Sequence, residues 1–237
     1  MAERVSDQPI WTCTCGVTHT GPKARCWNCT ERQTEEIFAP PEEREHGAGE
    51  WFKRGCELRH RGQHDGALRC YLLALDLNPR YACAWHNAGW SLARLGRYDE
   101  ALRCYDKAIE VDSRHTKSWY KKAQLLAELG QHEEAVGCCD RALAVGSGQA
   151  CSWGKEDIRN AWADKGDSLV ELDRYEEALW CYDRALALDP QNARIWALKG
   201  FSLLKLSRHD EALLCLGKVR ELDPRRTVVS GPTKKLA

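Results

Sequence analysis

The chain has 237 residues, and its 35 Lys and Arg are balanced by 35 Asp and Glu, so its formal net charge is zero. This balance argues against a general binder of nucleic acid or of anionic membranes, because such binders need a basic excess. No secretory signal and no apolar run of about 18 residues is present, so we expect no membrane span. Thirteen cysteines in such a chain favour a reducing, cytoplasmic location, where they act as metal ligands or as small core residues.

Two close cysteine pairs stand near the start, in the stretch WTCTCGVTHTGPKARCWNC. Four thiolates can close a tetrahedral shell around Zn²⁺, and a segment this short needs a metal to fold. The stretch resembles a small zinc ribbon. Over residues 1–30 we therefore predict a structural Zn²⁺ site, with the ligands Cys13, Cys15, Cys26 and Cys29. Two disulfides or an unstructured thiol tail remain alternatives, and His19 could replace one ligand.

Residues 31–47 follow as an acidic stretch that contains Pro40-Pro41 and ends in glycine. Such a segment has little apolar surface to bury and is predicted to be a solvated linker.

After the linker, tryptophan recurs with a period of 34 residues. It occupies positions 51, 85, 119, 162 and 196, and the one longer interval contains a nine-residue insertion. Gly or Ala follows each tryptophan by four residues, Ala by sixteen and Cys by nineteen. Small residues let two helices approach closely while the tryptophan fills the space that remains. Each unit is thus predicted to be a pair of amphipathic helices.

Turn residues separate the two helices of each unit. They are Gly62, Gly96 and Gly130, then Asp173 and Ser207. Glycine suits the end of a helix because it accepts a positive φ without a Cβ clash. Asn-Pro or Asp-Pro closes the second helix in three units, since proline cannot continue a helix.

The whole pattern resembles the tetratricopeptide repeat (TPR) family. The cleanest copy is carried by Trp85, Gly89, Leu92, Gly96, Tyr98, Ala101, Tyr105 and Ala108. The resemblance implies an all-α, right-handed superhelical array of five repeats with a concave groove lined by the first helices. The predicted units are 48–81, 82–115, 116–149, 159–192 and 193–224, with an insertion near 146–158.

The resemblance also implies which residues face the groove. Those we select for peptide binding are His86, Asn87, Trp90, Lys117, Tyr120, Lys121 and Gln124. Asn87, Lys117 and Lys121 match the clamp with which some members grip the acidic tails of heat-shock chaperones, whereas Phe52 and Cys56 depart from it. Two lysines suit an acidic segment of a protein or peptide. The alternative is a solvated face whose lysines have no ligand.

Other residue types that could carry chemistry occupy repeat slots. His64, His132 and His209 share their slot with tyrosines, and five cysteines share another, so both sets are predicted to pack. No phosphate-binding loop or catalytic motif is present, and we expect no enzyme. Trp153, inside the insertion, either packs on the array or contacts a partner, and we favour packing.

The last predicted helix carries Leu213, Leu214 and Leu216, and only a short basic tail, residues 225–237, follows it. An apolar surface left open there favours self-association or a docking edge, with fraying as the alternative. The predicted function is a scaffold that binds a protein or peptide. The alternative is a nucleic-acid-associated protein that uses the ribbon as reader and the array as platform.

Overall fold

The computed structural model describes residues 10–12, 18–20, 47–146 and 153–224. The chain divides into two compact units, residues 1–47 and residues 48–237. In the first unit, strand β1 (Ile10–Thr12) pairs antiparallel with β2 (Thr18–Thr20), and Trp11 lies opposite His19. The four predicted zinc ligands, residues 31–46, residues 147–152 and the tail 225–237 lie outside the described residues.

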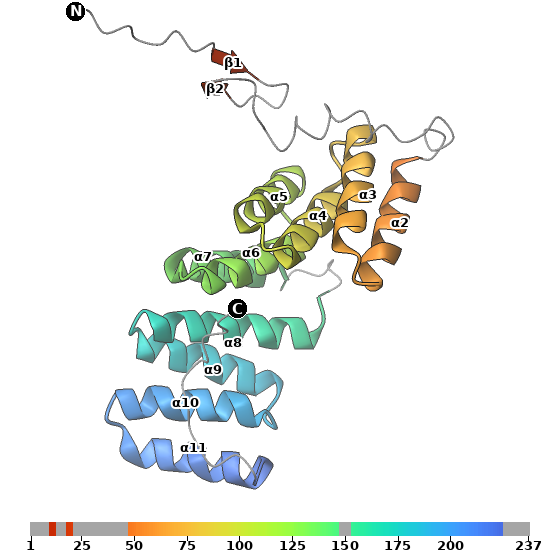
Figure 1. Cartoon of the computed structure of the whole chain (residues 1–237). Helices are drawn as coiled ribbons and strands as arrows, with labels where there is room; N and C mark the ends of the chain where they lie inside the picture. The colour runs from red at the N-terminus through yellow and green to blue at the C-terminus, as the bar shows by residue number, and fades with distance from the viewer. Residues whose placement is uncertain (1–9, 13–17, 21–46, 147–152, 225–237) are drawn as a thin grey trace, which may run out of the picture. The chain divides into compact units, whose positions relative to one another are not determined.

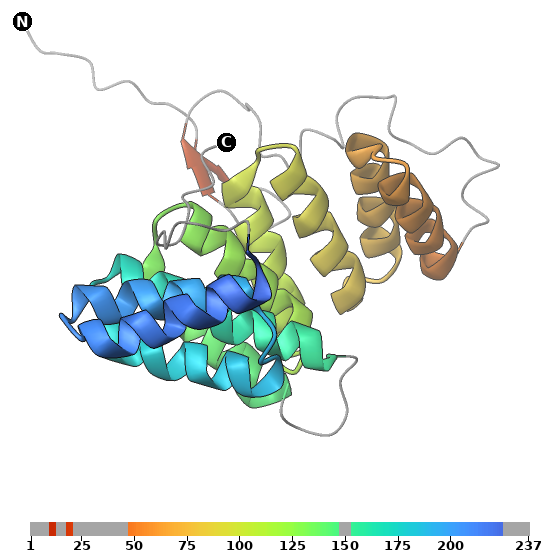
Figure 2. The ribbon, with the colours of Figure 1, turned by 90° about the horizontal axis from the view of Figure 1, so that it is seen from below.

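The second unit holds ten helices, counted over the described residues, which form five successive pairs (Figures 1 and 2). The first helices are α2 (Ala48–His60), α4 (Ala82–Arg94), α6 (Thr116–Glu128), α8 (Lys155–Glu171) and α10 (Ala193–Lys205). The second helices are α3 (His64–Leu77), α5 (Tyr98–Val111), α7 (His132–Gly146), α9 (Tyr175–Leu188) and α11 (His209–Leu222). The predicted helical array is confirmed. None of the described helices combines the length and apolar character needed to cross a membrane.

Each turn between paired helices places one residue in the left-handed region. The residue is glycine in the first three repeats, with φ of +75°, +76° and +78°, and Asp173 or Ser207, both at +58°, in the last two. The residue that follows then donates its N–H to a carbonyl five positions back, as Arg97 does to Leu92 at 2.9 Å. This bond satisfies a carbonyl at the helix end in all five repeats.

Within a repeat, the two helices meet where a small residue faces a large one. A Cβ at Gly166 would lie 2.6 Å from Cε1 of Tyr182, so the close approach needs glycine. Gly55 and Gly89 face tyrosines in the same way. In the third repeat Cys139 takes the slot of the tyrosine, and alanine takes the slot of the glycine. A larger side chain on the second helix is therefore matched by a smaller residue on the first helix.

Between repeats, the recurrent tryptophans bond back to the preceding unit. The indole N–H groups of Trp85 and Trp196 donate to the carbonyls of Pro79 and Pro190, each at 2.9 Å, and Trp119 donates likewise to Ser113. Trp51 is buried and the other four are partly buried, as expected for wedges between helices. Three equivalent ion pairs of 2.5 Å join consecutive repeats: Lys122–Asp106, Lys165–Asp140 and Lys199–Asp183.

The predicted insertion changes the fourth repeat. Helix α8 begins at Lys155, four residues before the predicted unit, and has 17 residues where the other first helices have 13. Trp153 is only 8% exposed and packs against Tyr120, Leu143 and neighbouring alanines. A Cβ on Gly146 would collide with its indole ring. The packing role favoured for Trp153 is therefore confirmed.

Candidate functional site

The first helices of consecutive repeats contact each other, whereas no two second helices do so among the described residues. We call the surface formed by α2, α4, α6, α8 and α10 the first-helix face. The seven residues predicted to bind a peptide all lie on α4 and α6, in the second and third repeats.

A histidine pair links these two repeats. The hydroxyl of Ser118 lies 3.1 Å from Nδ1 of His86 and 2.8 Å from Nδ1 of His115, and the imidazole rings are 5.1 Å apart. Nε2 of His115 lies 3.7 Å from the Cys83 thiol. Burial, the neighbouring imidazole and nearby lysines lower the pKa of His86 to about 3. Burial also lowers the pKa of His115, so both rings are neutral at pH 7 and act as hydrogen-bonding groups.

A second network joins the third and fourth repeats. Oδ2 of Asp164 accepts hydrogen bonds from the Tyr120 hydroxyl at 2.7 Å and from the Gln124 amide at 2.9 Å. The carbonyl oxygen of Gln124 accepts from Nζ of Lys121 at 2.8 Å. Burial and the Asp164 carboxylate raise the pKa of Tyr120, which is only 8% exposed and packs edge-on against Trp153. Tyr120 and Gln124 therefore stiffen the face, while Lys121 has its ammonium held in place.

Two other predicted residues are also fixed by neighbours. The side-chain amide of Asn87 donates to the Cys83 carbonyl of its own helix at 3.0 Å. The half-buried ring of Trp90 lies 5.2 Å from the guanidinium of Arg59 and 5.2 Å from the ring of His64. Trp90 thus packs toward the first repeat and keeps only part of its ring for a ligand.

Lys117 differs from the other predicted residues because it is exposed and takes part in no hydrogen bond or ion pair found in the described regions. It lies close enough to Cys83 and His115 to influence their pKa values. Lys121 contributes a second cation one helical turn away on α6. A carboxylate placed over this part of α6 would meet two ammonium groups.

The face turns acidic in the fourth repeat. Asp167 forms an ion pair with Arg194 at 2.7 Å and accepts a hydrogen bond from the Tyr182 hydroxyl at 2.8 Å. Burial raises the pKa of Asp167 to about 6 despite the opposing effect of Arg194, and the Asp164 and Glu171 carboxylates add to the rise. On the first-helix face, α8 therefore places the carboxylates Asp164 and Asp167 where α6 places two lysines.

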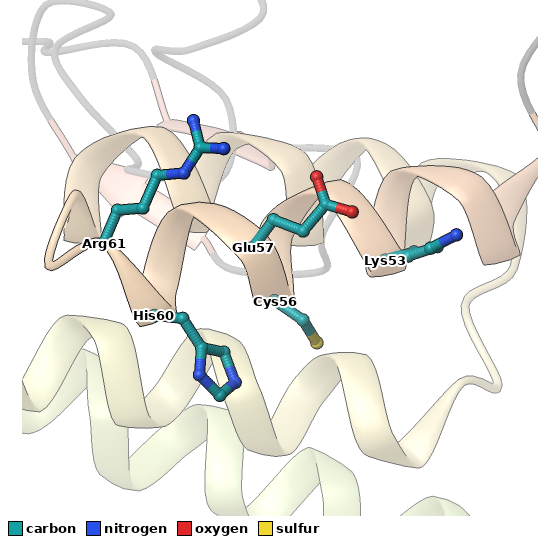
Figure 3. Close-up of a pocket in the computed structure, with 5 residues that line it drawn as sticks. All are labelled: Lys53, Cys56, Glu57, His60 and Arg61. Carbon is teal, nitrogen blue, oxygen red and sulfur yellow. The ribbon is translucent and has the colours of Figure 1, made fainter.

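An open hollow of about 420 Å³ lies on the first repeat, lined by Lys53, Cys56, Glu57, His60 and Arg61. Figure 3 shows four of them projecting from α2, and Arg61 follows directly after the helix ends at His60. Because one helix and the residue after it supply the whole lining, the hollow alone defines no ligand. Its charged lining residues are Lys53, Glu57 and Arg61.

His115 and Ser118 were missed as site residues by the sequence analysis. His115 precedes α6, outside the helical positions used for counting, but it has an equivalent 34 residues earlier in Tyr81. The ring of Tyr81 lies 4.8 Å from that of Phe52, just as His115 lies beside His86. The repeat period at the residue before each first helix was the available signal.

Over the regions that the structure describes, no group of three or more His, Cys, Asp or Glu side chains could hold a metal ion. The cysteines at the shared repeat slot, by contrast, are buried as expected for packing residues: Cys70, Cys104, Cys138, Cys181 and Cys215.

The stacked helix pairs place the chain in the class of helical-repeat proteins. Two family models described as tetratricopeptide repeat match residues 56–114 and 86–150, and one described as TPR repeat matches residues 166–207. Together they span more than half of the chain. The chain therefore belongs to the tetratricopeptide repeat family.

Solved structures share this fold. YrrB, described as a TPR protein with an unusual peptide-binding site, is 22% identical, with a TM-score of 0.68 over 82% of this chain and 96% of that one. MamA from Desulfovibrio magneticus RS-1 is 20% identical, with a TM-score of 0.66 over 76% and 97%. PilF of Pseudomonas aeruginosa is 17% identical, with a TM-score of 0.62 over 76% and 78%. A search of curated proteins found no match.

Proposed function

We propose that this protein is a non-enzymatic scaffold that binds a protein or peptide segment, acidic in part, on the first-helix face of its second and third repeats. The observation that carries the proposal is the pair of cations on α6, Lys117 and Lys121, set among side chains that already hold each other in place. A surface fixed before binding loses less conformational entropy when a ligand arrives.

Each part of the face has a role in such binding. Lys117 and Lys121 would pair with a carboxylate of the ligand, and the neutral His115 imidazole beside Cys83 would offer a hydrogen bond. The exposed part of Trp90 would supply flat apolar contact. The similarity to YrrB supports a peptide ligand, since the description of that protein names a peptide-binding site.

The test compares two peptide libraries that differ only in carrying Asp and Glu or Asn and Gln. We expect the acidic library to yield ligands, and Lys117→Ala with Lys121→Ala to weaken them about tenfold or more in a calorimetric titration. The matched control is Lys107→Ala with Lys218→Ala, which removes the same charge from exposed positions on second helices. Equal affinity of both double variants would contradict the assignment of this face.

We also propose that the N-terminal cysteines form a structural Zn²⁺ site. Their spacing supports it, and so does the β1–β2 hairpin, because Cys13 and Cys15 fall between two strands whose ends, Thr12 and Thr18, are paired. Closely spaced cysteine pairs are typical of structural zinc sites. Metal analysis of the purified full chain should find one zinc per chain, and Cys26→Ser with Cys29→Ser should abolish it. A wild-type chain without zinc would refute the site.

The remaining parts of the proposal concern partners and location. A second copy of the chain is a proposed partner through the C-terminal repeat, whereas the balanced charge gives no reason to include nucleic acid. A reducing compartment, the cytoplasm, suits a chain with thirteen cysteines. Sedimentation of the full chain over a range of concentrations tests self-association.

A further inference from the structure

Helix α11 exposes a position that is buried in three of the other repeats and partly buried in the second. Leu68 and Leu179 occupy this slot with 4% and 6% exposure, because the next repeat covers them. In the last repeat the slot holds Leu213, which is 65% exposed, and the adjacent Leu214 is 73% exposed. Leaving two leucines in water forgoes the free energy that their burial would provide.

The outward stripe of α11 is not built like the internal ones. Three positions spaced by helical turns continue it around Leu213, namely Asp210, Gly217 and Arg220. The slot of Arg220 holds the buried residues Leu75, Leu143 and Leu186 in other repeats. A Cβ at Gly217 would meet no atom within 4 Å. A further repeat packed in the usual way would bury the charge of Arg220, which is unfavourable.

The stripe is self-complementary when a second copy runs antiparallel to it. Asp210 stands near one end and Arg220 near the other, with Leu213 and Gly217 between them at equal distances from the midpoint. The flanking charges are already satisfied, since Glu211 pairs with Arg208 at 2.6 Å and Lys218 with Glu221 at 2.7 Å. Neither Asp210 nor Arg220 has an ion pair within the described part of the chain.

We propose that α11 is a homodimer interface, in which two copies of the chain cross antiparallel about a two-fold axis near Cys215. Asp210 then faces the partner's Arg220, and Leu213 fits over the partner's Gly217, whose missing side chain lets the helices come close. This proposal rests on the self-association part of the proposed function and is independent of the peptide-binding face. One helix pair buries less than a standard interface of about 1,600 Å², so we expect a dimer that dissociates at micromolar concentrations.

The test is sedimentation velocity of the full chain over a range of micromolar concentrations, with reductant present because Cys83 is an exposed thiol. Asp210→Arg and Arg220→Asp should each weaken the dimer about tenfold, because each turns two symmetry-related attractions into repulsions. An equimolar mixture of the two variants should dimerise again, since opposite charges meet at both contacts. A mixture that stays monomeric would overturn the antiparallel arrangement.

Two further variants separate the interface from folding. Gly217→Gln improves the helix propensity of α11 but fills the space needed by Leu213, so it should weaken the dimer while the melting temperature of the monomer holds or rises. Leu213→Asp should abolish the dimer, whereas the control Leu77→Asp, at a leucine 56% exposed on α3, should not. A monomeric wild type at every concentration, or a dimer indifferent to all α11 variants, would overturn the proposal.

Discussion

Two glycines in helix interiors should respond in opposite directions to the same substitution. Gly166 on α8 faces Tyr182, and its added Cβ would lie 2.6 Å from Cε1 and 2.9 Å from Cζ of that ring. Tyr182 is fully buried, and its hydroxyl is bonded to Asp167, so the ring has no room to retreat. Gly137 on α7 is exposed, and a Cβ there would meet nothing within 4 Å.

The expected magnitudes follow from two opposing effects. Alanine is better than glycine in a helix by about 1 kcal/mol, and Gly137→Ala should gain this amount. Overpacking a core costs roughly 1–3 kcal/mol, so Gly166→Ala should lower the free energy of unfolding by up to about 2 kcal/mol after the same helical gain. For a chain of this size, 1 kcal/mol corresponds to a change of about 2–4 °C in melting temperature.

Urea unfolding followed by far-UV circular dichroism measures both variants. The third repeat supplies the internal control, because there Ala123 faces Cys139 instead of tyrosine. Gly166→Ala should therefore cost less in a chain that also carries Tyr182→Cys, with a coupling of about 0.5–3 kcal/mol. If Gly137→Ala and Gly166→Ala changed the free energy of unfolding in the same direction, the argument that tyrosine requires glycine on the facing helix would be refuted.

Two further predictions concern backbone strain and pH. Ser207→Gly should raise the free energy of unfolding by about 1 kcal/mol, because Ser207 holds a φ of +58° that glycine adopts without a Cβ clash; unchanged urea unfolding would contradict this. The pKa of His86 is about 3 in the folded chain against an ordinary 6.5, so the unfolded chain binds the proton first and stability is lost as the pH falls from 6.5 towards 3. Between pH 6.5 and 4.5 this loss amounts to about 2–3 kcal/mol, and His86→Gln should lose that much less than wild type when unfolding is measured at both pH values.

Much of the fold could be predicted because the forces that specify it act at fixed sequence spacing. The turn positions Gly62, Asp173 and Ser207 were visible from the repeat period alone, and all three have positive φ. The recurrent small residues were visible for the same reason, but the large residue that faces Gly55, Gly89 and Gly166 is tyrosine, whereas the sequence analysis named tryptophan. Since each repeat packs mainly on its neighbours, five weak patterns in phase determine one architecture.

The site was less accessible because its geometry depends on hydrogen bonds between repeats. Counting places Tyr120 and Gln124 on the ligand-facing side of α6, but it does not show that both donate to Asp164, some 40 residues away in the sequence. Nor does it show that Ser118 joins His86 to His115. The repeat position of a residue predicts which face of the helix it lies on. Its hydrogen-bond partners determine whether the side chain is available to a ligand.

The departures from regularity separate the chain's two proposed surfaces. Along the first-helix face, one slot holds Phe52, His86 and Tyr120 in the first three repeats, where Ala163 and Ala197 follow in the last two. Both alanines are buried, so at this slot the rings lie entirely before the insertion. The unusual surface of α11, by contrast, belongs to the last repeat. Because coupling in such arrays passes only from neighbour to neighbour, a ligand on α6 and a second copy on α11 should bind independently, and one scaffold would then present two copies of the same peptide-binding face.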